Sequence, residues 1–251
     1  MKLTQGVVFN RKKLNDKTFE IHISLTDSLG EFRSGNFVML SFENYLTPFL
    51  PRPFSIFDLT GNVLKLVFRV VGKGTELLAT TKLPFSLKVW GVLGNSFPNF
   101  DTGKNVVVAG GLGLVPVFSL NRFVNIERFF VGYKNASEAF LLKELMANYN
   151  LTVSTDDGSL YEKGFITEHF ERYLMELGNN LLNVYACGPE PFIKRVYEIG
   201  KKYNLNNIYA SFETVMACGF GVCLGCAVET PYGYVKICKK GPVFNVKEIF
   251  G

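Results

Sequence analysis

The run Val106-Val107-Val108-Ala109-Gly110-Gly111-Leu112-Gly113-Leu114-Val115-Pro116 contains the strongest indication of fold class in this sequence. Its first four residues are apolar and mostly β-branched, which predicts a strand that is buried on both faces of a parallel sheet. The glycines that follow predict a tight turn, and a helix is expected near Val115 to Phe123. A buried strand, a glycine-rich turn and a helix in this order form the arrangement that binds a nucleotide phosphate in open parallel sheets.

Downstream of this run, segments that favour strands alternate with segments that favour helices. Repeated βα units of this kind predict a doubly wound parallel sheet. Strands are expected at Phe129 to Tyr133, Leu151 to Ser154, Leu182 to Ala186 and Ile208 to Phe212, and helices at Ser137 to Ala147, Phe165 to Leu177 and Glu190 to Tyr203.

Upstream, short segments rich in β-branched and aromatic residues are separated by Gly, Asn, Asp or Pro, which is typical of an antiparallel barrel or sandwich. The expected strands are Val7 to Phe9, Phe19 to Ser24, Phe37 to Phe42, Phe54 to Phe57, Val63 to Val71 and Ser86 to Val92. A short helix is expected after Thr75, which we predict to be its N-cap. With a boundary near Phe100 to Lys104, we expect an antiparallel β-barrel at 1–100, a parallel α/β domain at 101–212 and a small cysteine-containing module at 213–251.

Composition excludes several classes of protein. The chain has 251 residues, 47% of them apolar and 20% charged, with a net charge of +5 and a mean hydropathy of +0.15. The basic residues form no run or stripe, so nucleic-acid binding is not expected. No segment has the length and polarity of a membrane span, and Met1 to Gly6 lack the apolar core of a secretory signal, so we expect a soluble cytoplasmic protein. His22 and His169 are the only histidines, which excludes a His-rich metal centre and disfavours Ser-His-Asp catalysis.

Four of the five cysteines lie close together near the end of the chain. Cys218, Cys223 and Cys226 have the spacing C-x4-C-x2-C, and Cys238 follows after eleven intervening residues. This spacing is that of a plant-type [2Fe–2S] site, and the intervening glycines give the loop the freedom to curl around two irons. The alternative is a structural zinc site, although zinc more often uses two short cysteine pairs. In a cytoplasmic protein, disulfides are not expected here.

Three other motifs precede helices or begin strands. Arg52-Pro53-Phe54-Ser55 begins a barrel strand, and an arginine there can pair with a pyrophosphate. Gly72-Lys73-Gly74-Thr75 precedes the short helix, whose N-terminus can receive the remaining phosphate oxygens. Cys187-Gly188-Pro189-Glu190 lies between a strand and a helix, where Gly188 allows a flat ring to approach closely. Taken singly, an ordinary proline turn, a capped helix and a buried strand cysteine explain these motifs equally well.

In this order, the motifs resemble those of the ferredoxin–NADP reductase superfamily, over nearly the whole chain. The resemblance implies that Arg52, Pro53, Phe54 and Ser55, with Val67-Phe68-Arg69 on a second strand and Gly74-Thr75, bind FAD. It implies that Gly110, Gly111 and Gly113, together with Cys187-Gly188-Pro189, bind the nicotinamide nucleotide.

The cysteine module is similar to that of the electron-transfer subunits of type B dihydroorotate dehydrogenases. The closest stretches are Ser154-Thr155-Asp156-Asp157-Gly158-Ser159, Tyr185-Ala186-Cys187-Gly188-Pro189 and Glu213 to Cys226. This resemblance implies a [2Fe–2S] cluster, FAD, NAD as co-substrate, and a heterotetramer with two copies of a separate FMN-containing catalytic subunit that oxidises dihydroorotate in pyrimidine synthesis.

The chemistry of the implied cofactors is consistent with this arrangement. A nicotinamide transfers two electrons as hydride and an iron–sulfur cluster transfers one, so a flavin is needed between them. The chain has no obvious base for a substrate, and we therefore expect no catalytic residues of its own. Two alternatives remain open: a reductase subunit of a ferredoxin–NADP transhydrogenase or hydrogenase complex, and a zinc-stabilised binding module without enzymatic activity.

Overall fold

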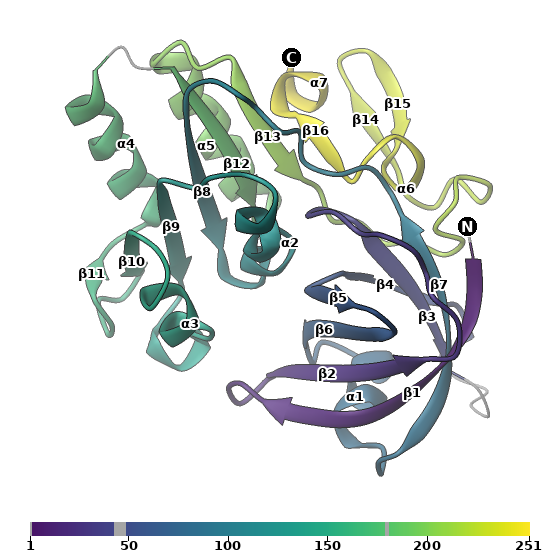
Figure 1. The fold of residues 1–251 in the computed structure, drawn as a ribbon. Helices are drawn as coiled ribbons and strands as arrows, with labels where there is room; N and C mark the ends of the chain where they lie inside the picture. Colours follow the sequence, from purple (N-terminus) through teal and green to yellow (C-terminus); the bar gives the residue numbers. More distant parts are fainter. Residues whose placement is uncertain (1, 43–48, 179–180) are drawn as a thin grey trace.

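The computed structural model describes residues 2–42, 49–178 and 181–251, and its first sheet is a curled, antiparallel half-barrel (Figure 1). The strands are β1 (Lys2–Lys13), β2 (Thr18–Leu25), β3 (Phe37–Phe42), β4 (Arg52–Ser55), β5 (Asp58–Thr60), β6 (Val63–Arg69) and β7 (Phe85–Leu93). They are ordered β4-β3-β7-β1-β2-β6-β5, and the sheet curls until β4 contacts β6. Fully buried Ile21, Leu40 and Leu66 fill its interior, because alternate residues of each strand face inward. The predicted antiparallel architecture is confirmed.

The short helix α1 (Lys73–Thr80) begins earlier than the sequence suggested. Gly72 is its N-cap and Thr75 is the third helical residue, so the prediction of Thr75 as N-cap is wrong. The Thr75 hydroxyl instead accepts hydrogen bonds from the backbone N–H groups of Val71 (3.0 Å) and Gly72 (3.2 Å). It therefore caps the helix from inside, as the third residue of a capping box does.

The second sheet is parallel except at one edge. Its strands are β8 (Lys104–Gly110), β9 (Arg128–Tyr133), β10 (Leu151–Thr155), β11 (Glu162–Lys163), β12 (Leu182–Cys187), β13 (Asn207–Ser211) and the antiparallel β16 (Val243–Asn245). The order β11-β10-β9-β8-β12-β13-β16 runs in opposite directions on either side of β8 and β12, which creates a topological switch point. Ligands of open α/β sheets bind at the carboxyl ends of the strands at such a point.

Helices cover both faces of this sheet, as Figure 1 shows. They are α2 (Leu114–Phe118), α3 (Leu142–Met146), α4 (Ile166–Leu177) and α5 (Glu190–Lys202), with short 3-10 turns at η1 (Gly111–Gly113), η2 (Ser119–Arg122) and η3 (Ala136–Glu138). Val106 and Val108 pack with α4 and α5, whereas Val107 and Ala109 pack with α2 and α3. All four are fully buried, which confirms the doubly wound arrangement. The helix expected at Ser137 to Ala147 is shorter, because η3 and an extended segment replace its first half.

The cysteine module (213–251) closes the molecule at the junction of the two sheets. It contains the hairpin β14 (Ala227–Thr230) and β15 (Gly233–Lys236), then α6 (Ile237–Lys240), β16 and α7 (Val246–Phe250). Through β16 the chain returns to pair with β13 of the parallel sheet. The loop before the hairpin lies against the barrel, since an added Cβ at Gly219 would stand 2.6 Å from the side chain of Met39. The module thus contacts both sheets.

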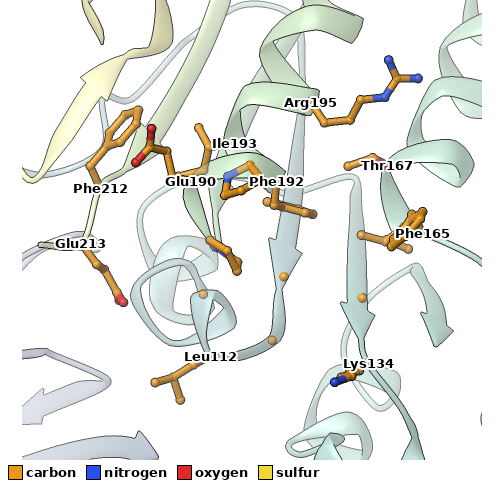
Figure 2. A pocket seen from close by; sticks show the side chains of 18 of the residues that line it. Leu112, Lys134, Phe165, Thr167, Glu190, Phe192, Ile193, Arg195, Phe212 and Glu213 are labelled. Carbon is orange, nitrogen blue, oxygen red and sulfur yellow. The ribbon is translucent and has the colours of Figure 1, made fainter. Parts of the chain in front are cut away.

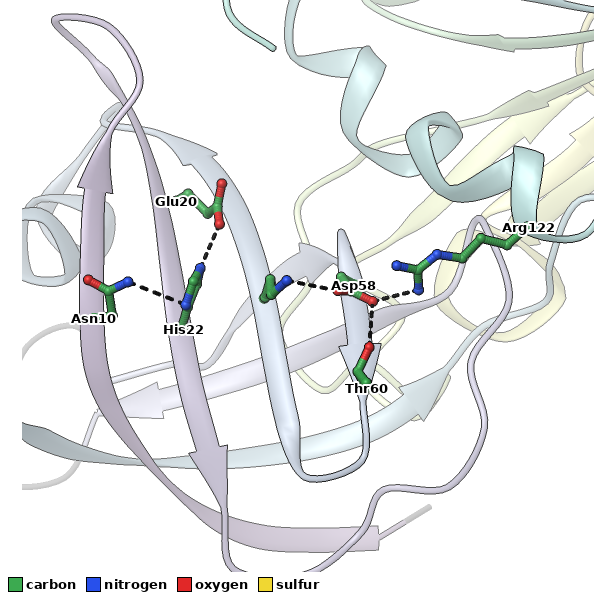
Figure 3. A network of polar contacts seen from close by, with 7 residues as sticks. Asn10, Glu20, His22, Asp58, Thr60 and Arg122 are labelled. Carbon is green, nitrogen blue, oxygen red and sulfur yellow. Dashed lines mark hydrogen bonds and ion pairs between the residues drawn. The ribbon is translucent and has the colours of Figure 1, made fainter. Parts of the chain in front are cut away.

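An ion pair joins the half-barrel to the parallel domain (Figure 3). Asp58 on β5 is buried and accepts a hydrogen bond from Arg122 of η2 at 2.6 Å, while Lys65 lies 3.1 Å from its other oxygen. Burial alone would raise the pKa of Asp58, but the two cations outweigh it and lower that pKa. Buried Ser34 of the barrel also donates to the carbonyl of Pro116 at 2.6 Å. These contacts fix the orientation of the two sheets.

Among residues 2–42, 49–178 and 181–251, no helix combines the length and the apolar character that a membrane-spanning segment needs.

Candidate functional site

A large cavity of about 1120 Å³ lies at the carboxyl edge of the parallel sheet (Figure 2). The sequence-predicted nucleotide residues Gly110, Gly111, Gly113, Gly188 and Pro189 all line it. In Figure 2 the cavity extends from Leu112 and Glu213 on the barrel side to Lys134, Phe165 and Arg195 on the far side. Its position at the switch point, its glycine turns and its length suit a dinucleotide.

Two glycines allow the turn after β8 to lie close to β12. An added Cβ at Gly113 would lie 2.3 Å from the carbonyl oxygen of Cys187, so no larger residue fits there. Gly111 has a φ of +55°, in the left-handed region that glycine adopts without strain. The close packing brings the two predicted motifs, one after β8 and one after β12, to the same side of the cavity.

Cys187 is placed differently from its neighbours. It is fully buried as the last residue of β12, and it is not among the described residues that line the cavity. Burial raises the pKa of its thiol far above the usual range, so the thiol is protonated and uncharged at neutral pH. Cys187 therefore supports the surface formed by Gly188 and Pro189, and a direct contact with a ligand stays a prediction.

A second cavity of about 200 Å³ lies between the barrel and the parallel domain. Its described lining includes Pro53, Phe54 and Ser55 of β4, Val67, Phe68 and Arg69 of β6, and Thr75 of α1. These are the residues that the sequence predicts for FAD on two strands and a helix N-terminus, and the curl of the sheet brings the two strands together. The cavity therefore has the composition expected for a flavin site, with apolar walls and a few polar groups.

Two predicted FAD residues lie outside this cavity. The Arg52 guanidinium donates hydrogen bonds to the carbonyls of Leu50 (2.8 Å) and Pro51 (3.3 Å), and Arg52 does not line either cavity in the described part of the chain. Gly74 is buried within α1. The role of Arg52 in binding pyrophosphate stays a prediction, which requires its side chain to leave these carbonyls. Arg69 lines both cavities and lies 3.0 Å from Glu138, across the boundary between the two domains.

The two cavities adjoin each other. They share Arg69, Val71, Leu112, Phe212, Glu213 and Thr214 in their linings. A ring bound in one cavity can therefore approach a ring bound in the other, which direct hydride transfer between a nicotinamide and a flavin requires. Sequence reasoning missed this shared wall, although Phe212 ends the predicted last strand and Glu213 directly follows it, at the edge where ligands bind.

Glu213 contributes a carboxyl group to this shared wall. Its side chain is open to the cavity, yet surrounding protein desolvates the carboxylate and raises its pKa. Its charge also helps to raise the pKa of the Cys187 thiol, after the larger effect of burial. A carboxyl group with a raised pKa beside two cavities binds a proton more readily than an ordinary glutamate does.

The four clustered cysteines form two pairs. The Sγ atoms of Cys226 and Cys238 are buried and 3.1 Å apart, and the Cys238 N–H points to the Cys226 sulfur at 3.4 Å. Cys218 is hydrogen-bonded to the side chain of Cys223, which is exposed. Within the described ranges no three His, Cys, Asp or Glu side chains are gathered into a complete metal site. Cys218 nevertheless lies near enough to Cys238 for its charge to help raise the pKa of that thiol, so the two pairs are neighbours.

Backbone amides prepare one pair for metal binding. Partial burial would raise the pKa of Cys218, but hydrogen bonds from the N–H groups of Cys223, Phe220 and Val222 outweigh it and lower that pKa. Burial and the neighbouring Cys226 raise the pKa of Cys238, as expected for a thiol beside another sulfur without metal. N–H groups directed at thiolates also stabilise the charge of an iron–sulfur cluster. The donor set fits such a cluster.

Comparisons with known proteins agree with this geometry. Residues 213–250 match the family model for the iron–sulfur cluster binding domain of dihydroorotate dehydrogenase B. The chain is 34% identical to the dihydroorotate dehydrogenase B (NAD(+)) electron transfer subunit of Clostridium acetobutylicum, covering 99% of this chain and 97% of that protein. It is 32% identical to the subunit of the same name from Caldanaerobacter subterraneus, covering 86% of each. Among solved structures, a chain of NADH-dependent reduced ferredoxin-NADP oxidoreductase has a TM-score of 0.85 at 23% identity and covers 97% of this chain and 89% of its own, which shows a shared fold.

The exposed member of the cysteine set provides a test of the ligand assignment. Cys223→Ser should abolish cluster assembly and leave FAD bound, because Cys223 does not line the flavin cavity. Iron, acid-labile sulfide and the visible spectrum of the purified, reconstituted protein measure both cofactors. Leu224→Ser is the matched control, since Leu224 is an exposed neighbour that cannot bind metal. Full cluster absorbance in Cys223→Ser would contradict the assignment.

The raised pKa of Glu213 predicts a pH-dependent effect on stability. The folded state binds this proton more tightly than the unfolded chain, so stability is lost as pH rises from about 4.5 through the folded-state pKa. Glu213→Gln should therefore have the same Tm as the parent protein near pH 4 and a higher Tm at pH 7, at equal flavin occupancy. Glu213 is exposed, so solvent screening reduces the effect, and we expect a difference of about 2–4 °C in Tm at pH 7, which corresponds to about 1 kcal/mol. A difference in Tm that does not vary with pH would show that this carboxyl titrates normally.

Proposed function

Because the chain belongs to the family of dihydroorotate dehydrogenase B electron transfer subunits, we propose that it transfers electrons between NAD+ and a separate FMN-containing catalytic subunit, through FAD and a [2Fe–2S] cluster, in pyrimidine synthesis. The observation that carries this proposal is the shared wall of the two cavities. The cavity that we assign to the nucleotide and the cavity that we assign to the flavin have Leu112, Phe212 and Glu213 in common. The second cavity is also lined by Thr214 and Met216, which precede Cys218 in the chain.

Each group has a place in the chain that suits its chemistry. When bound, FAD supplies the exchange between two-electron and one-electron transfer. Leu112, Gly188 and Pro189 form the surface on which a nicotinamide can lie, and Ser55 lines the flavin cavity with a hydroxyl group. Glu213 lies between the two cavities and can hold the proton that accompanies flavin reduction. The cysteine loop provides the route for single electrons to the surface.

The surface around the cysteine loop suits a protein partner. Residues 214–227 contain no charged side chain. Val215, Phe220, Val222 and Leu224 are 82%, 45%, 73% and 62% exposed, next to the exposed Cys223. An uncharged, apolar patch beside a redox centre favours a docking surface over a solvated loop. We place the catalytic subunit on this patch, in a heterotetramer of two subunits of each kind, in the cytoplasm, where a reducing environment keeps such thiols available for iron.

The central test is reconstitution with a dihydroorotate dehydrogenase B catalytic subunit. The pair should reduce NAD+ with dihydroorotate, and this reaction should require the cysteine module.

A variant tests the docking surface. Leu224→Glu should retain the flavin and cluster spectra and the NADH-dependent reduction of a dye. It should lower dihydroorotate-dependent NAD+ reduction and partner association at least about tenfold, since a buried unpaired charge costs several kcal/mol. Met175→Glu, an equally exposed substitution on α4, is the control. Normal coupling in Leu224→Glu would exclude this docking surface. A parent protein that reduces ferredoxin but not NAD+ with this partner would favour the transhydrogenase alternative.

The cavity also suggests which dinucleotide is bound. Asp156 follows β10 directly, lines the cavity and lies near Asp157 and Glu138, with Lys134 as the opposing charge. Burial and the two carboxylates raise the pKa of Asp156. A carboxylate at this edge accepts a hydrogen bond from a ribose 2′-hydroxyl and repels a 2′-phosphate. This favours NAD over NADP.

Asp156→Asn should shift the preference toward NADPH. We expect the ratio of kcat/KM for NADPH to that for NADH to rise about tenfold, which corresponds to about 1.4 kcal/mol of relieved repulsion. Asp157→Asn is the matched control, because the Asp157 carboxylate accepts hydrogen bonds from the N–H (2.9 Å) and hydroxyl (2.6 Å) of Ser159 instead of lining the cavity. An equal shift in both variants would point to a general effect of charge.

A further inference from the structure

The cysteine module forms part of the wall of the dinucleotide cavity. Val228 and Glu229 of β14, Ile237 of α6 and Ile249 of α7 line the large cavity, across from residues of the parallel domain. Ile237 belongs to the same buried apolar cluster as Ile193 and Phe212, which also line it. The segment expected to bind iron therefore also shapes the cavity expected to bind NAD.

The wall residues are directly connected to the cluster ligands. Ile237 immediately precedes Cys238, and the Ile237 N–H donates a hydrogen bond to the carbonyl of Cys226 at 3.1 Å. Val228 follows Cys226 by two positions on the strand that leaves the cysteine loop. A displacement of the Cys226–Cys238 pair must therefore also displace this wall.

The module has few means of holding that wall in place by itself. Its regular elements are a two-stranded hairpin, helices of four and five residues, and the three-residue strand β16. A two-stranded hairpin is marginally stable alone, and small modules commonly gain their order from bound metal. A [2Fe–2S] cluster requires its four thiolates at fixed distances from one another, and Cys238 lies on α6 next to Ile237. Cluster assembly thus selects one position of the wall.

We infer that cluster assembly and dinucleotide binding are thermodynamically coupled through the segment Ile237–Cys238, so that the iron-loaded module completes the NAD cavity. This inference rests on the proposed function and adds a regulation to it: a chain that lacks its cluster binds dinucleotide weakly and withdraws few electrons from NADH. Coupling between two sites is reciprocal, so bound NAD+ must also stabilise the assembled cluster.

The test compares NAD+ affinity in the FAD-loaded protein before and after anaerobic removal of iron by a chelator. Equilibrium titration by calorimetry should give a Kd that is about 5- to 150-fold higher without iron, the usual range of coupling between sites. Flavin content, read from the visible spectrum, must be equal in both samples. In the reverse direction, saturating NAD+ should slow the loss of iron to the chelator. Equal Kd values with and without iron would overturn the inference.

Substitutions of wall residues test the effect of the wall on NAD+ binding without removing any cysteine ligand. Ile237→Ala keeps all four cysteines and should retain full iron and sulfide, while its NAD+ Kd rises and the difference between iron-loaded and iron-depleted protein shrinks. Ile249 also lines the cavity but is distant in sequence from the cysteine ligands. Ile249→Ala should also raise the NAD+ Kd with iron retained, and it replaces Ile237→Ala in the test if that variant does not fold. Tyr232→Ala, an exposed substitution in the same module but outside the cavity, should leave the Kd unchanged. Parent-like affinity in a folded Ile237→Ala or Ile249→Ala would refute the coupling, whereas the proposed function would fail only if NADH did not reduce the flavin of the parent protein.

Discussion

The packing of residues 213–251 into the junction of the two sheets is the contact on which electron transfer through this chain depends. Two redox groups on different modules exchange electrons only if those modules keep a fixed separation. One apolar cluster supplies this rigidity, since it contains Met39 and Leu93 of the barrel, Val108 of the parallel sheet, and Ile237 and Cys238 of the tail. Because protein interiors are close-packed, a shift of the tail cannot be absorbed locally and is transmitted to both neighbours. The return of β16 to the edge of the parallel sheet adds backbone hydrogen bonds to the same contact.

The junction of the barrel and the parallel domain meets a related requirement, because it must bring two flat rings together and also hold a path to the cysteine loop. The shared wall of Leu112, Phe212 and Glu213 provides the meeting point. Away from this wall, the buried Asp58 with Arg122 and the bond from Ser34 to Pro116 hold the domains in register. A buried carboxylate is costly unless it is paired, so the Asp58 contacts specify one orientation of the domains over others. The polar contacts at the edge of the domain junction set the orientation of the domains, and the apolar contacts at its centre place the two cavities side by side.

The loop that carries Cys218, Cys223 and Cys226 has one buried side and one exposed side. Its inner side, with Met216 and Cys226, is buried against the body of the protein, whereas Val222 and Leu224 on its outer side remain exposed. Tight turns at Gly219 and Gly221, with φ of +80° and +90°, allow the backbone to alternate between these sides and to direct its N–H groups at Cys218. Such a loop can hold a redox group close to a partner without opening the protein core to water.

The sequence alone determined the two sheet types and indicated which cofactors to expect, because strand periodicity, glycine turns and cysteine spacing are local properties of the chain. The residues that it assigns to each cofactor stay predictions. It also predicted Ser55 and Val67 as neighbours of one ligand, and the structure brings both to the smaller cavity. It did not determine that Thr75 caps its helix from within, that Arg52 turns to nearby carbonyls, or that Cys187 lies beneath its cavity, since these depend on which neighbours compete for each polar or apolar group. Nor could it show that Glu213 lines both cavities or that Ile237 lines the larger one. Those roles arise where segments distant in sequence meet, and only the packing of the three modules against one another brings them together.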